Sequence, residues 1–196
     1  MAVTDRVTII TGAGGPLGLA AGRAFRAAGT RLVLVVRSRE DARRLQEEYR
    51  GAPVLVEQAD LAEDDLEAEL AGNLRSVFLM CRAVVPHLTG QGWGRIINLG
   101  ARSGLQGRAR AAAHAVAKGG VILLTEALAD ELKAAGVTAN VLIPSVIDTP
   151  ANRRIWPNAD FSAWVPPEQL AATMLFLCSD EAAAITGARI SVPNRV

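Results

Sequence analysis

Short apolar runs alternate with longer amphipathic stretches along the whole chain. The short runs are rich in β-branched residues, which predicts strands, and the longer stretches carry Ala and Leu at helical spacing, which predicts helices. The predicted strands are Val7–Ile10, Arg31–Val36, Val54–Val56, Arg95–Leu99, Val137–Ile143 and Ala188–Val192. The predicted helices are Leu17–Ala28, Arg39–Tyr49, Glu63–Ala71, Leu74–His87, Ala111–Ala135 and Glu168–Cys178.

This order of elements predicts the fold class. Strands that are apolar almost throughout are typical of parallel sheets with helices on both faces. Strands that alternate with helices form right-handed βαβ units. We therefore expect an α/β fold in which residues 1–196 form one domain, a doubly wound, six-stranded parallel sheet in a Rossmann-type three-layer sandwich. A ligand of such a sheet lies across the carboxyl ends of its strands.

Composition and charge narrow the classes of function. The 196 residues are 50% hydrophobic, and 21 basic residues against 20 acidic ones give a net charge of +1, which argues against nucleic acid as a partner. Two cysteines, Cys81 and Cys178, provide neither a disulfide framework nor a metal cluster. The N-terminal residues lack the pattern of a signal peptide, and no apolar run approaches the ~20 residues of a membrane span. We expect a cytoplasmic protein without a membrane partner.

A glycine-rich turn follows the first predicted strand and opens the first predicted helix. The segment Thr11–Gly18 places glycines where the chain must turn tightly and where a phosphate must approach the backbone. The helix that follows offers its free amides and the positive end of its dipole to an anion. The residues predicted to bind a dinucleotide here are Gly12, Gly14, Gly15, Leu17 and Gly18.

The pattern TGxxxGxG in this context resembles the short-chain dehydrogenase/reductase family. Other segments resemble the family along most of the chain: Asp60-Leu61, Asn73-Leu74, Gly94–Leu99 and Asn140–Pro144. The resemblance implies an NAD(P)-dependent oxidoreductase that transfers a hydride to a small carbonyl or imine. It also implies that Asp60 and Leu61 bind the adenine side of the cofactor, that Asn73 is catalytic, and that Lys118, Pro144 and Thr149 contact the nicotinamide side.

Two segments near the C-terminus are similar to one branch of the family. Asp148–Arg153 and Pro157–Trp164 resemble the quinoid dihydropteridine reductase branch. Relatives also associate through the helices that carry Asn73 and His114, so the resemblance implies a homo-oligomer.

The end of the second predicted strand bears on the choice of cofactor. Relatives that use NAD carry an acidic residue where Val36 stands, and Val36 cannot accept a hydrogen bond from the ribose 2′-hydroxyl. Arg37 offers a guanidinium that can pair with a 2′-phosphate. The sequence therefore predicts NADP as the cofactor, with NAD as the alternative, unless Arg37 is only a solvated charge.

The catalytic residues of the family are only partly present. Where the family has Tyr-x-x-x-Lys, this chain has His114 and Lys118, and its only tyrosine, Tyr49, lies in a different predicted helix. The position of the family's catalytic serine is matched by Ala101, a loss that dihydropteridine reductases share. The candidate catalytic residues are therefore His114, Lys118 and Asn73.

One βα unit of the family is also absent. No Asn in this chain is followed by Ala-Gly, the ending of the family's fourth strand, and the stretch from Asp60 to Asn73 has room for one helix only. An empty slot would leave backbone groups unpaired, at roughly 1–3 kcal/mol each. We therefore expect the strand around Ile96 to pair directly with the strand around Ile9, giving the order 3-2-1-5-6-7 in the family's strand numbers.

Three interpretations of function remain open at this point. The first is an active NADP-dependent reductase in which His114 replaces the tyrosine as proton donor, since imidazole serves as a general acid near neutral pH. The second is a catalytically degenerate pseudoenzyme that binds nucleotide, or only its own copies. The third is a truncated chain without a native role of its own.

Overall fold

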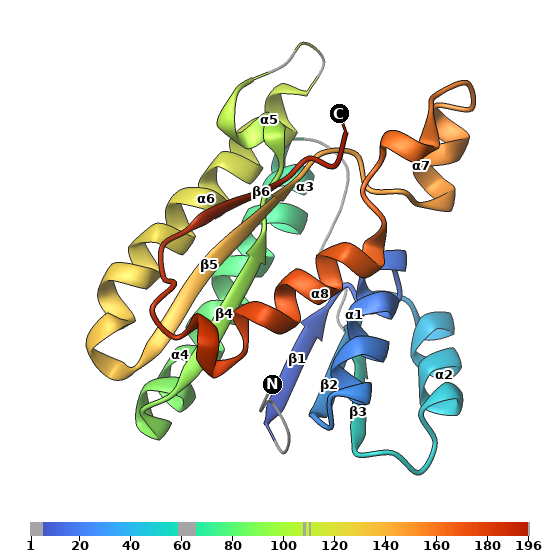
Figure 1. Cartoon of the computed structure of the whole chain (residues 1–196). Coiled ribbons are helices and arrows are strands. Elements are labelled where there is room, and N and C mark those ends of the chain that lie inside the picture. Colours follow the sequence, from blue (N-terminus) through green and yellow to red (C-terminus); the bar gives the residue numbers. More distant parts are fainter. Residues whose placement is uncertain (1–5, 59–65, 108, 110, 196) are drawn as a thin grey trace. The chain divides into compact units, whose positions relative to one another are not determined.

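The computed structural model describes residues 6–58, 66–107, 109 and 111–195. The chain divides into two compact units, each with its own three-stranded parallel sheet (Figure 1). Unit 1 comprises Met1–Asp60, Ile147–Phe161 and Pro166–Glu181, and unit 2 comprises Leu61–Val146, Ser162–Val165 and Ala182–Val196.

In unit 1 the strands lie in the order β1-β2-β3, with β1 at Val7–Thr11, β2 at Arg31–Val36 and β3 at Val54–Gln58. Its helices are α1 (Pro16–Ala27), α2 (Arg39–Glu48), α7 (Pro150–Ile155) and α8 (Pro167–Leu177). Alternate residues of β2 point into a core shared with α1, α2 and α8, which includes Leu32, Leu34, Val36, Phe25 and Leu45. Because side chains alternate across a strand, this one face of the sheet buries most of unit 1's apolar residues.

The opposite face of the unit 1 sheet is not covered by the helices of unit 1's own core. Val7, Ile9 and Leu55 point to that face and are 55%, 43% and 54% exposed. The described helices of unit 1 that join its core, α1, α2 and α8, pack on the other face. An apolar residue in a strand sequence indicates that its side chain can be buried. Burial also requires a neighbouring element that packs on that face.

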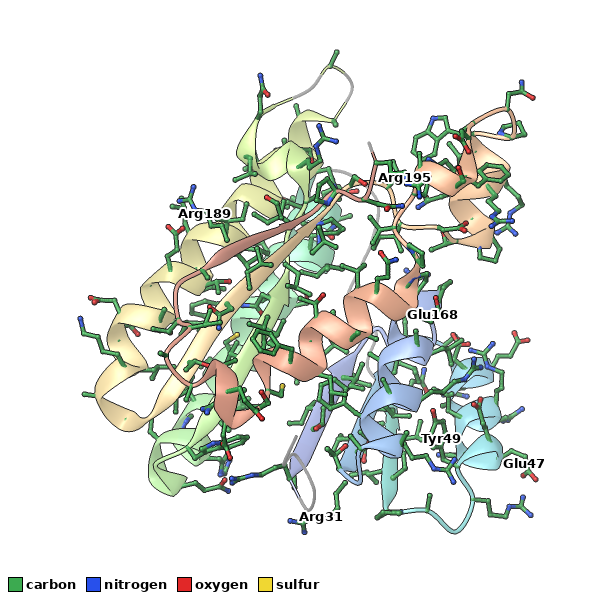
Figure 2. All side chains as sticks on the ribbon, in the orientation of Figure 1. Arg31, Glu47, Tyr49, Glu168, Arg189 and Arg195 are labelled. Carbon is green, nitrogen blue, oxygen red and sulfur yellow. The ribbon has the colours of Figure 1, made fainter. Side chains whose placement is uncertain are left out.

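In unit 2 the strands lie in the order β4-β5-β6, with β4 at Gly94–Leu99, β5 at Val137–Pro144 and β6 at Arg189–Val192. Its helices are α3 (Leu66–Leu70), α4 (Ser76–Gln91), α5 (Arg102–Leu105) and α6 (Ala112–Leu132), with a π-helical turn at Ala71–Arg75 between α3 and α4. Every residue of the central strand β5 is buried. From β6, Arg189 reaches α6, where its Nη2 donates to Glu126 Oε2 at 2.9 Å (Figure 2).

The helix α6 is the main covering helix of unit 2. Together with the short 3-10 turn Lys133–Ala135, it is the one described stretch that is long and apolar enough to cross a membrane, by length and composition alone. Val121 and Ile122 are buried against Val141 and Ile143 of β5, and Leu128 packs in a second cluster with Ile96 of β4. These contacts are those of a core helix over a sheet.

The structure confirms the predicted α/β class, the six strands within the described residues, and the strand order inside each sheet. The predicted pairing between the strands around Ile9 and Ile96 is not among the ladders, which run β1-β2-β3 in one unit and β4-β5-β6 in the other, and it stays a prediction. Each sheet forms its own ladders, as β1 pairs with β2 and β4 pairs with β5.

The helices also differ from prediction at one important place. The sequence predicted two helices, with Asn73-Leu74 opening the second, but the chain is helical without a break from Leu66 to Gln91. Asn73 lies in the π-helical turn in the middle of this run. The short helices α5 and α7 were not predicted, since four and six residues are too few for a helical period to show.

Candidate functional site

The glycine-rich segment of unit 1 forms a compact turn between β1 and α1. Gly12 has a φ of +64°, which favours glycine, and its carbonyl accepts a hydrogen bond from the Gly15 amide at 3.0 Å. Gly15 is the N-cap of α1, and Pro16 begins the helix, where a missing N–H costs no helical bond. The first-turn amides, including those of Leu17 and Gly18, therefore lack partners four residues back along the helix.

Close packing explains why two of these positions are glycine. A Cβ at Gly18 would lie 2.3 Å from the Gly12 carbonyl oxygen and 2.6 Å from Ala13 Cα, both backbone atoms. A Cβ at Gly14 would lie 2.6 Å from Asp41 Cγ. At Gly15 the nearest atom would be 3.5 Å away, an ordinary contact, so packing within the unit does not require glycine there. These residues fit the phosphates of a dinucleotide, because the loop and the helix N-terminus present bare backbone to an anion.

The start of α2 lies against this loop. Ser38 caps α2 by accepting a hydrogen bond from the Asp41 amide, and its hydroxyl donates to Asp41 Oδ2 at 2.8 Å. Arg44 Nη2 donates to the Gly14 carbonyl at 3.1 Å and to Asp41 Oδ1 at 2.6 Å. The Asp41–Arg44 pair therefore fixes α2 to the glycine-rich turn, a contact that sequence analysis missed.

At the end of β2, Val36 is buried in the core and Arg37 is exposed. Gln58 Nε2 donates to the Arg37 carbonyl at 3.2 Å, a contact with the backbone that does not involve the Arg37 guanidinium. No described residue pairs with the Arg37 guanidinium. The arrangement leaves this charge available to an anionic ligand.

The candidate catalytic residues of unit 2 gather at the N-terminal part of α6. His114 and Lys118 lie one turn apart on this helix. Glycines let neighbouring elements approach it closely: a Cβ at Gly104 of α5 would lie 2.7 Å from the Lys118 carbonyl carbon, and one at Gly120 would lie 2.7 Å from the Leu74 side chain. Both α5 and the π-helical turn therefore pack directly against the helix that carries His114.

Glu69 connects two of the predicted residues. Its Oε2 lies 3.0 Å from His114 Nδ1 and accepts a hydrogen bond from Asn73 Nδ2 at 2.8 Å. The structure thus brings Asn73 and His114 together on one carboxylate oxygen. Glu69 itself was not predicted, although a carboxylate four residues before Asn73 on a helix was a readable signal.

Lys118 is held in a less polar setting. Its Nζ donates to the carbonyl of Leu99, at the end of β4, at 3.1 Å. Burial of the ammonium lowers the pKa of Lys118 below its usual value, and the nearby Glu69 carboxylate partly opposes this shift.

The two family positions that differ in this chain have clear structural settings. Tyr49 lies at the end of α2 in the core of unit 1 (Figure 2), where Arg26 stacks 5.1 Å from the centre of its ring. Burial raises the pKa of the Tyr49 phenol, and the Glu48 carboxylate adds to that effect. Tyr49 is therefore a core residue, which leaves His114 as the titratable side chain one turn before Lys118. Ala101 precedes α5 and provides no hydroxyl.

The remaining predicted cofactor residues have different surroundings. Pro144 is buried at the end of β5 and pairs in register with Val192 of β6. Thr149 is the N-cap of α7, where its hydroxyl accepts a hydrogen bond from the Asn152 amide at 3.1 Å. Capping α7 is by itself a structural reason for a threonine at position 149. Asp60 and Leu61 lie outside the described residues.

Parallel βαβ units with a glycine-rich turn at the first helix define a Rossmann-type, nucleotide-binding class of α/β protein. A family model described as enoyl-(acyl carrier protein) reductase matches residues 56–194. The chain belongs to the short-chain dehydrogenase/reductase family, whose members are NAD(P)-dependent oxidoreductases.

Individual relatives agree with this assignment. A probable galactose dehydrogenase of Rhizobium meliloti is 29% identical over 244 residues, covering 98% of this chain and 95% of the relative. A 3-oxoacyl-(acyl carrier protein) reductase of Vibrio cholerae is 34% identical over 165 residues, covering 76% of this chain and 68% of the relative. The solved structure of a short-chain dehydrogenase/reductase family oxidoreductase from Burkholderia thailandensis has a TM-score of 0.88 at 28% identity, covering 97% of this chain and 92% of that one.

The length of the first alignment bears on the missing βα unit. It extends over 244 positions, whereas this chain has 196 residues in total. The galactose dehydrogenase therefore carries residues that have no counterpart here. This agrees with a chain that has lost an internal segment of the family fold.

Proposed function

We propose that this protein binds NADP(H) and reduces a small carbonyl or imine substrate, with His114 as the proton donor. The observation that carries the proposal is the cluster of Glu69, Asn73, His114 and Lys118 in unit 2. A histidine on a carboxylate, one helical turn from a partly buried lysine, is an arrangement suited to proton transfer.

The glycine-rich segment of unit 1 supports the cofactor part of the proposal. Gly12, Gly14, Gly15, Leu17 and Gly18 would hold the phosphates through backbone amides, and Arg37 would pair with the 2′-phosphate of NADP. The residues proposed to complete cofactor binding are Asp60, Leu61, Lys118, Pro144 and Thr149. NAD is the alternative cofactor if Arg37 makes no such contact.

The chemistry of the residues follows from their atoms. When bound, the reduced nicotinamide supplies the hydride that reaches the carbonyl or imine carbon. His114 donates the Nε2 proton to the carbonyl oxygen or imine nitrogen, and it regains a proton from solvent. Asn73, whose amide is held by Glu69, keeps its carbonyl oxygen available for a water or a substrate hydroxyl. The resemblance to the dihydropteridine reductase branch supports the imine alternative.

Calorimetry with NADPH and NADH, together with loss of nicotinamide absorbance in the presence of ketones and cyclic imines, tests the proposal. We expect heat with NADPH and turnover that falls about 10²–10⁴-fold in His114→Ala, the usual contribution of a general acid. His114→Tyr should retain more activity than His114→Ala. Absence of heat with either coenzyme at millimolar concentration would contradict cofactor binding altogether.

A second candidate is a pseudoenzyme that binds NADP(H) without hydride transfer. Two observations favour it: Ala101 supplies no hydroxyl, and relatives carry a segment that this chain lacks. The same experiments separate the candidates, because binding without turnover supports the pseudoenzyme and turnover that depends on His114 supports the reductase.

We also propose that the protein is a cytoplasmic homo-oligomer that associates through α4 and α6. Val116 and Leu123 lie two turns apart on α6 and are 60% and 64% exposed, and Phe78 and Leu79 are exposed on α4. Apolar surface of this extent on adjacent helices is typical of subunit contacts. Sedimentation equilibrium of the purified protein tests this, and a monomer at every concentration would exclude it.

A further inference from the structure

The contacts of Glu69 define a single preferred state of the His114 ring. An ionised carboxylate only accepts hydrogen bonds, so the His114 Nδ1 atom 3.0 Å from Glu69 Oε2 must carry a proton. The neutral ring then has a bare Nε2, and the protonated ring has its exchangeable proton there. Among the described residues, none hydrogen-bonds Nε2.

The surroundings of this pair favour a role in positioning over a role in stability. The side chains of His114 and Glu69 are 39% and 42% exposed, so solvent and small molecules can reach them. Exposed ion pairs contribute little to stability, typically below ~1 kcal/mol. The pair also joins two elements, α3 and α6, that pack against each other.

The contact with Asn73 holds the Glu69 carboxylate more firmly than its pairing with His114 alone would. Asn73 Nδ2 donates to the same Oε2 atom at 2.8 Å, from the π-helical turn that follows α3. Ser76 Oγ donates to the Gly72 carbonyl at 2.7 Å and satisfies a backbone group of that turn. π-Helical turns are rare and frequently occur at functional sites.

We infer that Glu69 is a positioning residue that holds His114 in the Nδ1–H tautomer, so that Nε2 is the atom that exchanges a proton with the substrate. The part concerning substrate rests on the proposed reductase function. The part concerning the tautomer depends only on the geometry of unit 2. Catalytic triads use the same principle, because a carboxylate hydrogen-bonded to one histidine ring nitrogen fixes the tautomer and the direction of the other ring nitrogen.

Nitrogen NMR of the histidine rings tests the inference without any need for turnover. The chain has two histidines, His87 and His114, so two-bond proton–nitrogen spectra of ¹⁵N-labelled protein resolve both rings, with His87 as the internal reference. At a pH where both rings are neutral, we expect His114 in the Nδ1–H form and His87 in the Nε2–H form that is usual in water. An Nε2–H form of His114 in the unmodified protein would overturn the inference, and this measurement requires no variant.

Two variants of α3 provide a matched comparison. Glu69→Ala should convert His114 to the Nε2–H tautomer, whereas Glu67→Ala removes an exposed carboxylate from the same helix and should leave the His114 spectrum unchanged. Circular dichroism checks that both variants fold. A His114 tautomer that is the same in Glu69→Ala and in the unmodified protein would overturn the inference.

Kinetics then distinguish failure of the inference from failure of the proposed function. In an active enzyme, Glu69→Ala should lower kcat about 100-fold with KM changed less than about 2-fold, as expected for loss of a positioned general acid. Unchanged kcat would overturn the role of Glu69 in proton exchange. If the unmodified protein has the expected tautomer and no turnover with any substrate, the proposed reductase fails while the assignment of Glu69 stands.

Discussion

Arg37 and Lys118 are two cations of this protein with different surroundings. Arg37 is exposed at the end of β2 without a described partner, whereas Lys118 is partly buried and donates to a backbone carbonyl. A guanidinium in water remains charged and available to a phosphate. A desolvated ammonium has a lowered affinity for its proton.

Replacement of Arg37 tests the choice of cofactor. Arg37→Ser should weaken NADPH binding about 10–100-fold, because a charge-assisted hydrogen bond of about 1.5–3 kcal/mol is lost, and NADH binding should not change. Calorimetry with both coenzymes measures this. Arg43→Ser, which removes an exposed arginine from α2, is the control. Equal loss of NADPH and NADH affinity in Arg37→Ser would contradict the role of Arg37.

Replacement of Lys118 tests its burial. Since the pKa of Lys118 is lowered in the folded protein, the unfolded chain binds more protons between the lowered value and 10.5, the ordinary value for lysine. The free energy of unfolding of the unmodified protein should therefore rise with pH in that window, relative to that of Lys118→Met. If Lys118 were solvated, this relative rise would be absent. Urea unfolding from pH 7 to pH 10 measures the difference. The raised pKa of Tyr49 acts in both proteins and cancels.

The chain offers a matched control for this experiment. Its only other lysine, Lys133, is exposed and pairs with Asp130 at 2.6 Å. When the unmodified protein is compared with Lys133→Met, the difference in the free energy of unfolding should show no such rise between neutral and alkaline pH. Parallel pH profiles for unmodified protein and Lys118→Met would show that Lys118 is not desolvated.

At the scale of elements, the candidate functional groups lie at the junctions between one element and the next. The turn between β1 and α1 presents the loop amides, and the π-helical turn between α3 and α4 places Asn73 beside Glu69. Such junctions expose backbone groups that regular helices and strands already satisfy. Their conformations depend on close approaches that only small residues allow.

Alanine at two glycines separates packing from binding in the first junction. Gly18→Ala places a methyl group 2.3 Å from a backbone oxygen and should cost about 1–3 kcal/mol or more of stability, together with loss of NADPH binding. Gly15→Ala meets its nearest atom at 3.5 Å, so its unfolding free energy should change by less than about 1 kcal/mol while NADPH binding weakens at least about 10-fold. Thermal unfolding and calorimetry measure the two effects. Full binding by Gly15→Ala would argue against phosphate contact at that amide.

At the scale of the whole molecule, neither unit is a continuous stretch of chain. Unit 1 contains the N-terminal residues and two later segments, and unit 2 contains the residues between and after them. A unit assembled from distant segments cannot fold until the intervening chain is in place. We therefore propose that the chain acts as one domain, although it carries two sheets.

A single unfolding transition is the expected consequence. Trp156 lies in unit 1 and Trp93 in unit 2, so proteins that keep only one of these tryptophans, with the others replaced by phenylalanine, report on each unit separately. The fluorescence midpoints in urea should agree with each other and with far-ultraviolet circular dichroism. Two distinct midpoints would show that the units unfold independently.

Most of the secondary structure could be predicted from sequence, because it depends on local periodicity. The strands Arg31–Val36 and Val137–Ile143 and the helix around His114 and Lys118 were predicted closely. Breaks and short turns were predicted poorly. The continuous helical run through Asn73 depends on a π-helical turn, which leaves no period in the sequence.

The sequence by itself determined the α/β class, the family, the glycine-rich turn and the presence of His114 and Lys118 one helical turn apart, because each of these depends on residues close together along the chain. Only the tertiary structure decided that Glu69 meets both Asn73 and His114, and that Arg44 fixes α2 to Gly14. The reason is physical: a hydrogen bond between distant residues depends on how helices and strands pack, and packing depends on the fit of many side chains at once.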